Sequence, residues 1–136
     1  MTPEARLTAV ENNLKALLGS DIYVTRSYSD LDTKMDTYPR MYAIVSSGFP
    51  QFGKLFDTED EIHNFMIVAQ EQVTEATAGS EKEAIEFAMI ENIRSLVAND
   101  GQQNAPLNIE IISARQSRQM DPLYAWVLCE LRFNDL

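Results

Sequence analysis

Residues 123–133 read LYAWVLCELRF, and this stretch decides the fold because its side chains alternate almost without error. Apolar side chains stand at every second position, beginning with Leu123 and ending with Phe133, and the positions between them include Glu130 and Arg132. Successive side chains of a β-strand point to opposite faces, so this period of two predicts a long strand with one buried face. A strand of this length is expected to lie inside a sheet.

Two further elements are expected just before this strand. Residues 107–114 also alternate and predict a shorter strand. Residues 80–97 predict a helix, because Ser80 and Glu83 have the spacing of a capping box and apolar side chains follow at intervals of three and four. The apolar face of this helix comprises Ala84, Ile85, Ala88, Met89, Ile93, Leu96 and Val97.

The N-terminal half predicts a helix followed by short strands. Residues 3–18 carry an apolar stripe between a capping threonine, Thr2, and a terminating glycine, Gly19. Residues 22–27 and 41–47 predict strands, and the polar segment 30–38 between them predicts a turn.

Residues 61–73 are compatible with either a helix or a strand. Their apolar positions fit a helical stripe, and Thr58 with Glu61 has capping-box spacing. Residues 65–69 are also a compact run of β-formers that pairs naturally with residues 41–47 as a hairpin. We favour the strand. The predicted fold is a single α+β domain, residues 1–136, with a mostly antiparallel five-stranded sheet packed by two helices in the order α-β-β-β-α-β-β.

The negative charge of the chain is concentrated in one stretch. Residues 57–91 hold ten of the 21 acidic residues and a single base, Lys82, which gives −9 of the formal net charge of −10. Proteins that bind nucleic acid tightly need clustered lysine and arginine, so a basic nucleic-acid-binding module is disfavoured. The chain has no apolar run that could cross a membrane, its N-terminus lacks the pattern of a secretory signal, and its one cysteine cannot form an internal disulfide. We therefore expect a cytosolic place of synthesis.

The stretch GFPQFGKL, residues 48–55, is the sharpest candidate for enzymatic chemistry. It matches a phosphate-binding loop up to Lys54, but Leu55 replaces the serine or threonine that would hold magnesium. The nucleotide interpretation is therefore disfavoured. Three aromatic residues remain in this loop, Phe49, Phe52 and Phe56, and they are expected either to contact a partner or to fold back over the sheet.

Metal binding and nucleophilic catalysis have little support in the sequence. His63 and Cys129 are the only residues of their types, so one chain cannot assemble a zinc cluster. Asp30, Asp32 and Asp36 lack the glycine and glutamate of a calcium loop. Cys129 is expected to be a buried thiol and His63 a surface residue at a strand end. We expect no catalysis, no cofactor and no metal.

With its elements in this order, the chain resembles the tail terminator, or tail completion, proteins of long-tailed bacteriophages, the family of the lambda tail terminator. The resemblance rests on the helix 3–18, the strand near 22–24, the Tyr38–Pro39 turn that leads into 41–47, and the strand 63–69. The capped helix 80–97 and the closing pair of strands complete it.

The resemblance implies a structural protein of the virion tail that is assembled in the host cytoplasm. Such proteins form a homohexameric ring that caps the tail tube, stops its polymerisation and offers a docking surface to the neck or head connector. Their channels are commonly acidic, so DNA passes without tight binding. The alternative is another small neck or connector component, or an α+β protein-binding module, again without catalysis.

The residues themselves suggest which surfaces such a ring would use. For contacts between subunits we nominate Phe49, Phe52 and Phe56, together with Arg115 and Arg118 in the predicted loop between the last two strands. The acidic candidates for the surface or channel are Asp57, Glu59, Asp60, Glu61, Glu81, Glu83, Glu86 and Glu91. The last four surround the helix 80–97 away from its predicted apolar face, where an ordinary solvated surface is the alternative.

Overall fold

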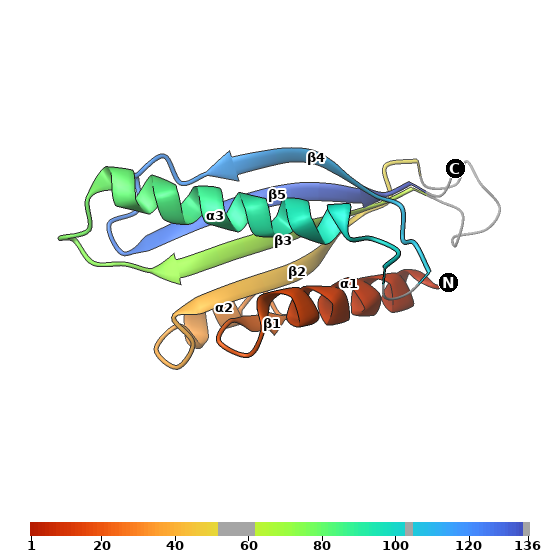
Figure 1. Cartoon of the computed structure of the whole chain (residues 1–136), viewed down its shortest axis with the longest axis horizontal. Helices are drawn as coiled ribbons and strands as arrows, with labels where there is room; N and C mark the ends of the chain where they lie inside the picture. The colour runs from red at the N-terminus through yellow and green to blue at the C-terminus, as the bar shows by residue number, and fades with distance from the viewer. Residues whose placement is uncertain (52–61, 103–104, 135–136) are drawn as a thin grey trace.

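The computed structural model describes residues 1–51, 62–102 and 105–134 of the chain. Its elements are α1 (Pro3–Leu18), β1 (Tyr23–Thr25), α2 (Asp30–Thr33), β2 (Arg40–Gly48), β3 (His63–Gln72), α3 (Gly79–Ala98), β4 (Ile109–Gln116) and β5 (Tyr124–Phe133). The strands form one sheet in the order β1-β2-β3-β5-β4, and α1 and α3 lie across one face of it, here called the helix face (Figure 1). The predicted α+β class is confirmed.

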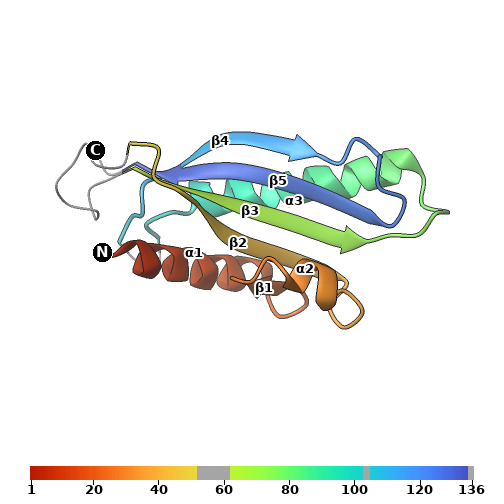
Figure 2. The same ribbon diagram turned by 180° about the vertical axis from the view of Figure 1, so that it is seen from behind.

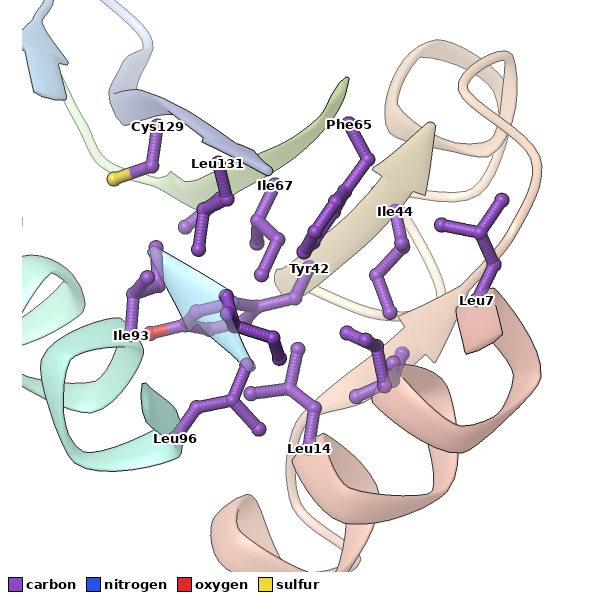
Figure 3. Close-up of a cluster of buried hydrophobic side chains, with 14 of the residues drawn as sticks. Leu7, Leu14, Tyr42, Ile44, Phe65, Ile67, Ile93, Leu96, Cys129 and Leu131 are labelled. Atoms are coloured by element: carbon purple, nitrogen blue, oxygen red, sulfur yellow. The ribbon is translucent and has the colours of Figure 1, made fainter. Parts of the chain in front are cut away.

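Strand β5 lies inside the sheet, as its alternation predicts. It is antiparallel to β3 on one side and to β4 on the other. Ala125, Val127, Cys129, Leu131 and Phe133 are buried beneath the helices, and the residues between them are half-buried on the opposite face, here called the back face. Figure 3 shows Cys129 and Leu131 in the core with side chains from α1, α3, β2 and β3.

The segment whose type was ambiguous is strand β3. It is antiparallel to β2 and β5, so its backbone hydrogen bonds are made on both edges. Phe65 and Ile67 are buried on the helix face and Val68 on the back face, where it packs against Leu31 and Met41. As a strand, this segment contributes apolar side chains to the packing on both faces of the sheet, so the strand interpretation is correct.

The sheet is mixed, because β1 runs parallel to β2. The segment predicted as a turn, residues 30–38, contains the short helix α2, which lies on the back face (Figure 2). Its Leu31 and the following Met35 are spaced four apart and are both buried against β2 and β3. Two apolar residues in a polar segment are enough to cover one end of the back face.

Helix α1 begins and ends as the sequence predicts. The Thr2 hydroxyl accepts a hydrogen bond from the Ala5 N–H at 3.1 Å, and Gly19 follows the last turn with a φ of 79°, in the left-handed region that favours glycine. The capping box predicted for α3 is wrong. This helix begins at Gly79 after Ala78, which has no side chain to cap it, and Glu83 instead accepts a hydrogen bond from Gln119.

The orientation of α3 also differs from the prediction. The residues it buries are Lys82, Glu86, Met89, Ile93 and Leu96, which recur at intervals of four and three. Ala84 and Ala88, predicted to face the core, are exposed. The N-terminal half of α3 therefore turns two charged side chains toward the sheet and leaves its alanines on the outside.

Candidate protein-binding surfaces

The connection between β4 and β5, residues 117–123, is held against α3 by the buried carboxylate of Glu86. Only 1% of Glu86 is exposed. Its Oε2 accepts hydrogen bonds from the Ser117 hydroxyl and, at 3.2 Å, from the Trp126 N–H, while its Oε1 accepts one from the Gln116 amide at 3.2 Å. A buried carboxylate is tolerated when its lone pairs are used in this way. We call residues 117–123 the hairpin tip.

Further contacts fix the hairpin tip on the first turns of α3. The buried Lys82 donates to the Asp121 carbonyl at 3.2 Å, and the Gln119 amide donates to Glu83 at 2.8 Å. Gly79 allows this approach, because a Cβ at that position would collide with the Gln119 side chain as it is placed. The hairpin tip and α3 therefore form one rigid unit.

The backbone of the hairpin tip is strained where it turns. The Met120 N–H donates to the Ser117 carbonyl at 3.2 Å, and the two residues between them, Arg118 and Gln119, both have a φ of 60°. This is a type I′ turn, which ordinarily uses asparagine and glycine. Two long side chains at left-handed positions cost of order 1–3 kcal/mol each. The hydrogen bonds to α3 hold the turn in place.

A hollow of about 600 Å³ lies at the hairpin tip. Its lining includes Arg115, Arg118, Met120, Asp121, Pro122 and Trp126. Met120 is 80% exposed, and Leu123 beside it is 46% exposed. We call this feature the tip hollow.

Both nominated arginines line the tip hollow, although Arg115 is in β4 and not in the loop that was predicted to hold it. Arg115 and Arg118 are exposed. The one acid in the lining, Asp121, accepts hydrogen bonds from the Leu123 and Tyr124 N–H groups at 3.0 and 3.2 Å. The tip hollow therefore combines apolar lining with two exposed arginines.

A second apolar surface lies on the outside of α3. Phe87 is 54% exposed and follows the buried Glu86, so a rotation of about 100° per residue turns it away from the sheet. Ala84 and Ala88 are exposed beside it. Glu83 and Glu91 stand one turn before and one turn after Phe87. We call these five residues the outer patch of α3.

The four acids nominated on this helix do not form one acidic face. Glu81 and Glu91 are exposed, and Glu91 pairs with Arg94 at 2.8 Å. Glu83 is half-buried. Glu86 is a correction to the predicted acidic surface: it lies in the interior because the helix is rotated, and it cannot line a channel.

Of the three aromatic residues nominated in the connection between β2 and β3, the structure describes only Phe49. Phe49 is half-buried and stacks on His63 with ring centroids 4.5 Å apart, so it folds back toward the sheet. Phe52, Phe56, Asp57, Glu59, Asp60 and Glu61 lie outside the described residues.

His63 is buried, not on the surface as predicted, with only 1% exposed. Its Nε2 lies 2.8 Å from the Ser46 hydroxyl, and its ring is also 5.7 Å from that of Phe133. Burial, followed by the positive charges of Arg6 and Arg26, lowers the pKa of His63 below 6.5. The ring therefore belongs to the core in its neutral form.

The remaining candidates for catalysis and metal binding, Cys129 and the acids of residues 30–36, were also named from the sequence. Burial raises the pKa of the Cys129 thiol to about 11, which suppresses the reactive thiolate. Asp30 is buried and accepts a hydrogen bond from the Thr25 hydroxyl at 2.7 Å. Within residues 1–51, 62–102 and 105–134, no three His, Cys, Asp or Glu side chains gather where they could hold a metal ion, and no helix is long and apolar enough to cross a membrane.

Strand β4 is an outer strand of the sheet, but its edge is irregular. Its pairing with β5 shifts between Ile111 and Ser113, which leaves Ile112 in a bulge with 45% of its surface exposed. Bulges interrupt the row of backbone groups that another strand would need for pairing. The side-chain surfaces are therefore better candidates for docking than this edge.

Neither a scan against protein-family models nor a search of curated proteins returns a match to this chain.

The buried polar groups that shape both surfaces were not predicted from the sequence. Lys82 and Glu86 appear as solvent-facing charges when residue type alone is considered. Their spacing carried a signal, since they continue the interval of four and three set by Met89, Ile93 and Leu96. The bonds from Gln116 and Ser117 had no local signal, because these residues lie 30 and 31 positions from Glu86.

Proposed function

We propose that the chain is a structural protein of a phage tail that assembles into a ring, caps the tail tube, stops its polymerisation and forms the surface that joins the head. The observation that carries this proposal is the order of the elements. A capped helix, a short strand, the β2–β3 hairpin, a long helix and a closing strand pair follow one another, with the short helix α2 inserted before β2, and apart from α2 this order is the one on which the resemblance rests. Since this order covers nearly the whole chain, the proposal rests on the whole domain and not on a single motif.

The surfaces of the domain support an assembly role. Phe87 and Met120 are large apolar side chains that are mostly exposed, and each is accompanied by charged residues. Exposed apolar groups of this kind are characteristic of sites that dock on another protein. The buried thiol of Cys129 and the buried ring of His63 offer no accessible nucleophile or base, so the proposed role includes no catalytic step.

The charge of the chain supports the passage of DNA without binding. A net charge of −10 repels phosphate groups, and Glu81 and Glu91 are exposed on α3. In the proposed ring some acidic side chains face the channel. The protein would lie in the virion tail after assembly in the host cytoplasm, between the tube protein and a neck or head connector protein.

The test is electron microscopy of the purified chain, alone and after mixing with self-polymerising tube subunits from the genome that encodes it. The expected result is a ring of defined symmetry, hexameric by the resemblance, and tubes whose growth stops. Tubes that grow without restriction at a ring-saturating concentration would overturn the proposal.

A second candidate function is a neck or connector component, or another protein-binding module, that works as one copy. The tip hollow favours it, because two arginines over an apolar floor suit an acidic, apolar segment of a different protein. A chain that remains monomeric by native mass spectrometry, both alone and with tube subunits, would favour this candidate over the ring.

A further inference from the structure

We propose that copies of this chain associate head to tail, with the outer patch of α3 in one copy seated in the tip hollow of the next. This inference rests on the proposed ring and names the surfaces that would build it. The occupant of each surface is a second copy of the same chain.

The charges of the two surfaces are complementary. The outer patch places Phe87 between Glu83, which accepts a hydrogen bond from Gln119, and Glu91, which pairs with Arg94 of the same helix. The tip hollow places Met120 beside Arg115 and Arg118, with Asp121 as the one acid of its lining. Docking one on the other brings acids to arginines around an apolar centre. A symmetric contact, in which the same surface of two copies meets, would bring like charges together, which is unfavourable. Charge therefore selects the head-to-tail arrangement over a symmetric pair.

The positions of the two surfaces favour the same arrangement. Phe87 is 54% exposed and follows the buried Glu86, so it lies on the side of α3 that is turned away from the sheet. Trp126 alternates with the buried Val127, and Arg115 pairs with Leu128. The side chains of Trp126 and Arg115 therefore project from the back face. The outer patch and the tip hollow of one copy face opposite sides of the sheet, so they cannot contact each other within that copy. Contacts from helix face to back face generate a ring when the rotation closes.

The size of the tip hollow fits an aromatic anchor. It is an open depression of about 600 Å³, which is roomy enough to admit the ring of one aromatic side chain. An aromatic side chain buries roughly 150–250 Å². Side chains of this kind at the centre of an interface contribute most of its affinity.

The proposed contact explains why the hairpin tip keeps a strained turn. Arg118 has a left-handed backbone beside Met120, which is 80% exposed, and the hydrogen bonds from its neighbours Gln119 and Ser117 to Glu83 and Glu86 hold the turn. A turn of asparagine and glycine would give the same hairpin without strain. The residues present instead place a cation and an apolar side chain at the rim of the tip hollow.

The test uses two variants that each remove one surface, Phe87→Ser and Met120→Ser, and a matched control, Tyr28→Ser, which removes a 57% exposed aromatic outside both surfaces. Assembly is measured by sedimentation velocity and native mass spectrometry, and folding by circular dichroism. We expect each of the two variants to weaken self-association at least about 30-fold in Kd, while the control assembles like the original chain.

Mixing the two variants separates a head-to-tail contact from a symmetric one. The Phe87→Ser copy keeps its tip hollow and the Met120→Ser copy keeps its outer patch, so the mixture should form one-to-one heterodimers and nothing larger. A mixture that stays monomeric, or a variant that assembles unchanged, would overturn the proposal. So would an original chain that stays monomeric up to about 1 mM.

The outcomes also distinguish this inference from the proposed function. If both variants still form rings that cap tubes, the assigned contact is wrong and the ring proposal stands. If the original chain associates head to tail but leaves tube growth unrestricted, the contact is supported and the tail function is wrong.

Discussion

Replacing Glu86 with alanine should destabilise the domain more than any substitution of an exposed acid. The side chain accepts hydrogen bonds from the buried Ser117 and from the half-buried Trp126 and Gln116, and the accepting carboxylate is itself only 1% exposed. In the Glu86→Ala variant the Ser117 hydroxyl and the Trp126 N–H lose their acceptor without gaining water. The buried amine of Lys82, one helical turn away, also loses a neighbouring negative charge.

The magnitude follows from these groups. Each buried donor left without an acceptor costs about 1–3 kcal/mol, whereas the half-buried Gln116 amide can turn to solvent at little cost. The expected total is about 3–5 kcal/mol, as for other buried charged groups whose removal strands a partner. Glu86→Gln keeps the shape and one accepting oxygen, so it should lose only about 1–2 kcal/mol.

The assay is equilibrium unfolding in urea, followed by the fluorescence of Trp126, the only tryptophan of the chain. With a slope of about 2 kcal/mol per M, a loss of about 4 kcal/mol lowers the midpoint by roughly 2 M. The matched control is Glu91→Ala, on the same helix but exposed and paired with Arg94, which should change stability by less than about 0.5 kcal/mol. Equal losses for Glu86→Ala and Glu91→Ala at an unchanged slope would refute the role assigned to the buried carboxylate.

Two further predictions concern other buried groups. The pKa of His63 is lowered in the folded state, so the unfolded chain binds the proton more readily and stability should be complete above about pH 6.5 and fall as the pH decreases through that value. Urea midpoints at pH 7.5 and 5.5 should therefore differ more in the original chain than in His63→Gln, and equal differences would contradict a buried neutral ring. Because burial raises the pKa of Cys129 to about 11, a thiol reagent at pH 8 should modify the folded protein at least about 100-fold more slowly than the urea-unfolded protein; comparable rates would show that the thiol is accessible.

Much of the fold was predictable because long strands carry a strong period. The alternation at residues 123–133 can be satisfied only by a strand with one buried face, and β5 has that structure. The hairpin of β2 and β3 followed from the pairing of two β-rich runs. In contrast, β1 has three residues, too few for a period, and its parallel pairing with β2 depends on the packing of α1 and α2 around it.

The candidate surfaces were predictable only in part. Arg115 and Arg118 were identified from their place near the last loop, and both line the tip hollow. Phe87 was not nominated, although the predicted helix face also left it outside the core, and Ala84 and Ala88 were wrongly placed in the core. The error has one physical cause: a buried Lys82 and Glu86 are stable only with acceptors and donors from the distant hairpin tip, which a single helix does not reveal.

The same pair of adjacent residues links stability to the proposed assembly. Glu86 faces inward and fixes the hairpin tip, whereas Phe87 faces outward at the centre of the outer patch. The angle between the two proposed contact surfaces is therefore set by the hydrogen bonds of Glu86 together with those of Lys82 and Glu83. A head-to-tail contact closes into a ring only at a defined rotation per subunit, and any looseness between its two surfaces permits open chains instead. The buried charge, costly for a small domain, is explained if ring closure requires the tip hollow and the outer patch to be held at one fixed angle.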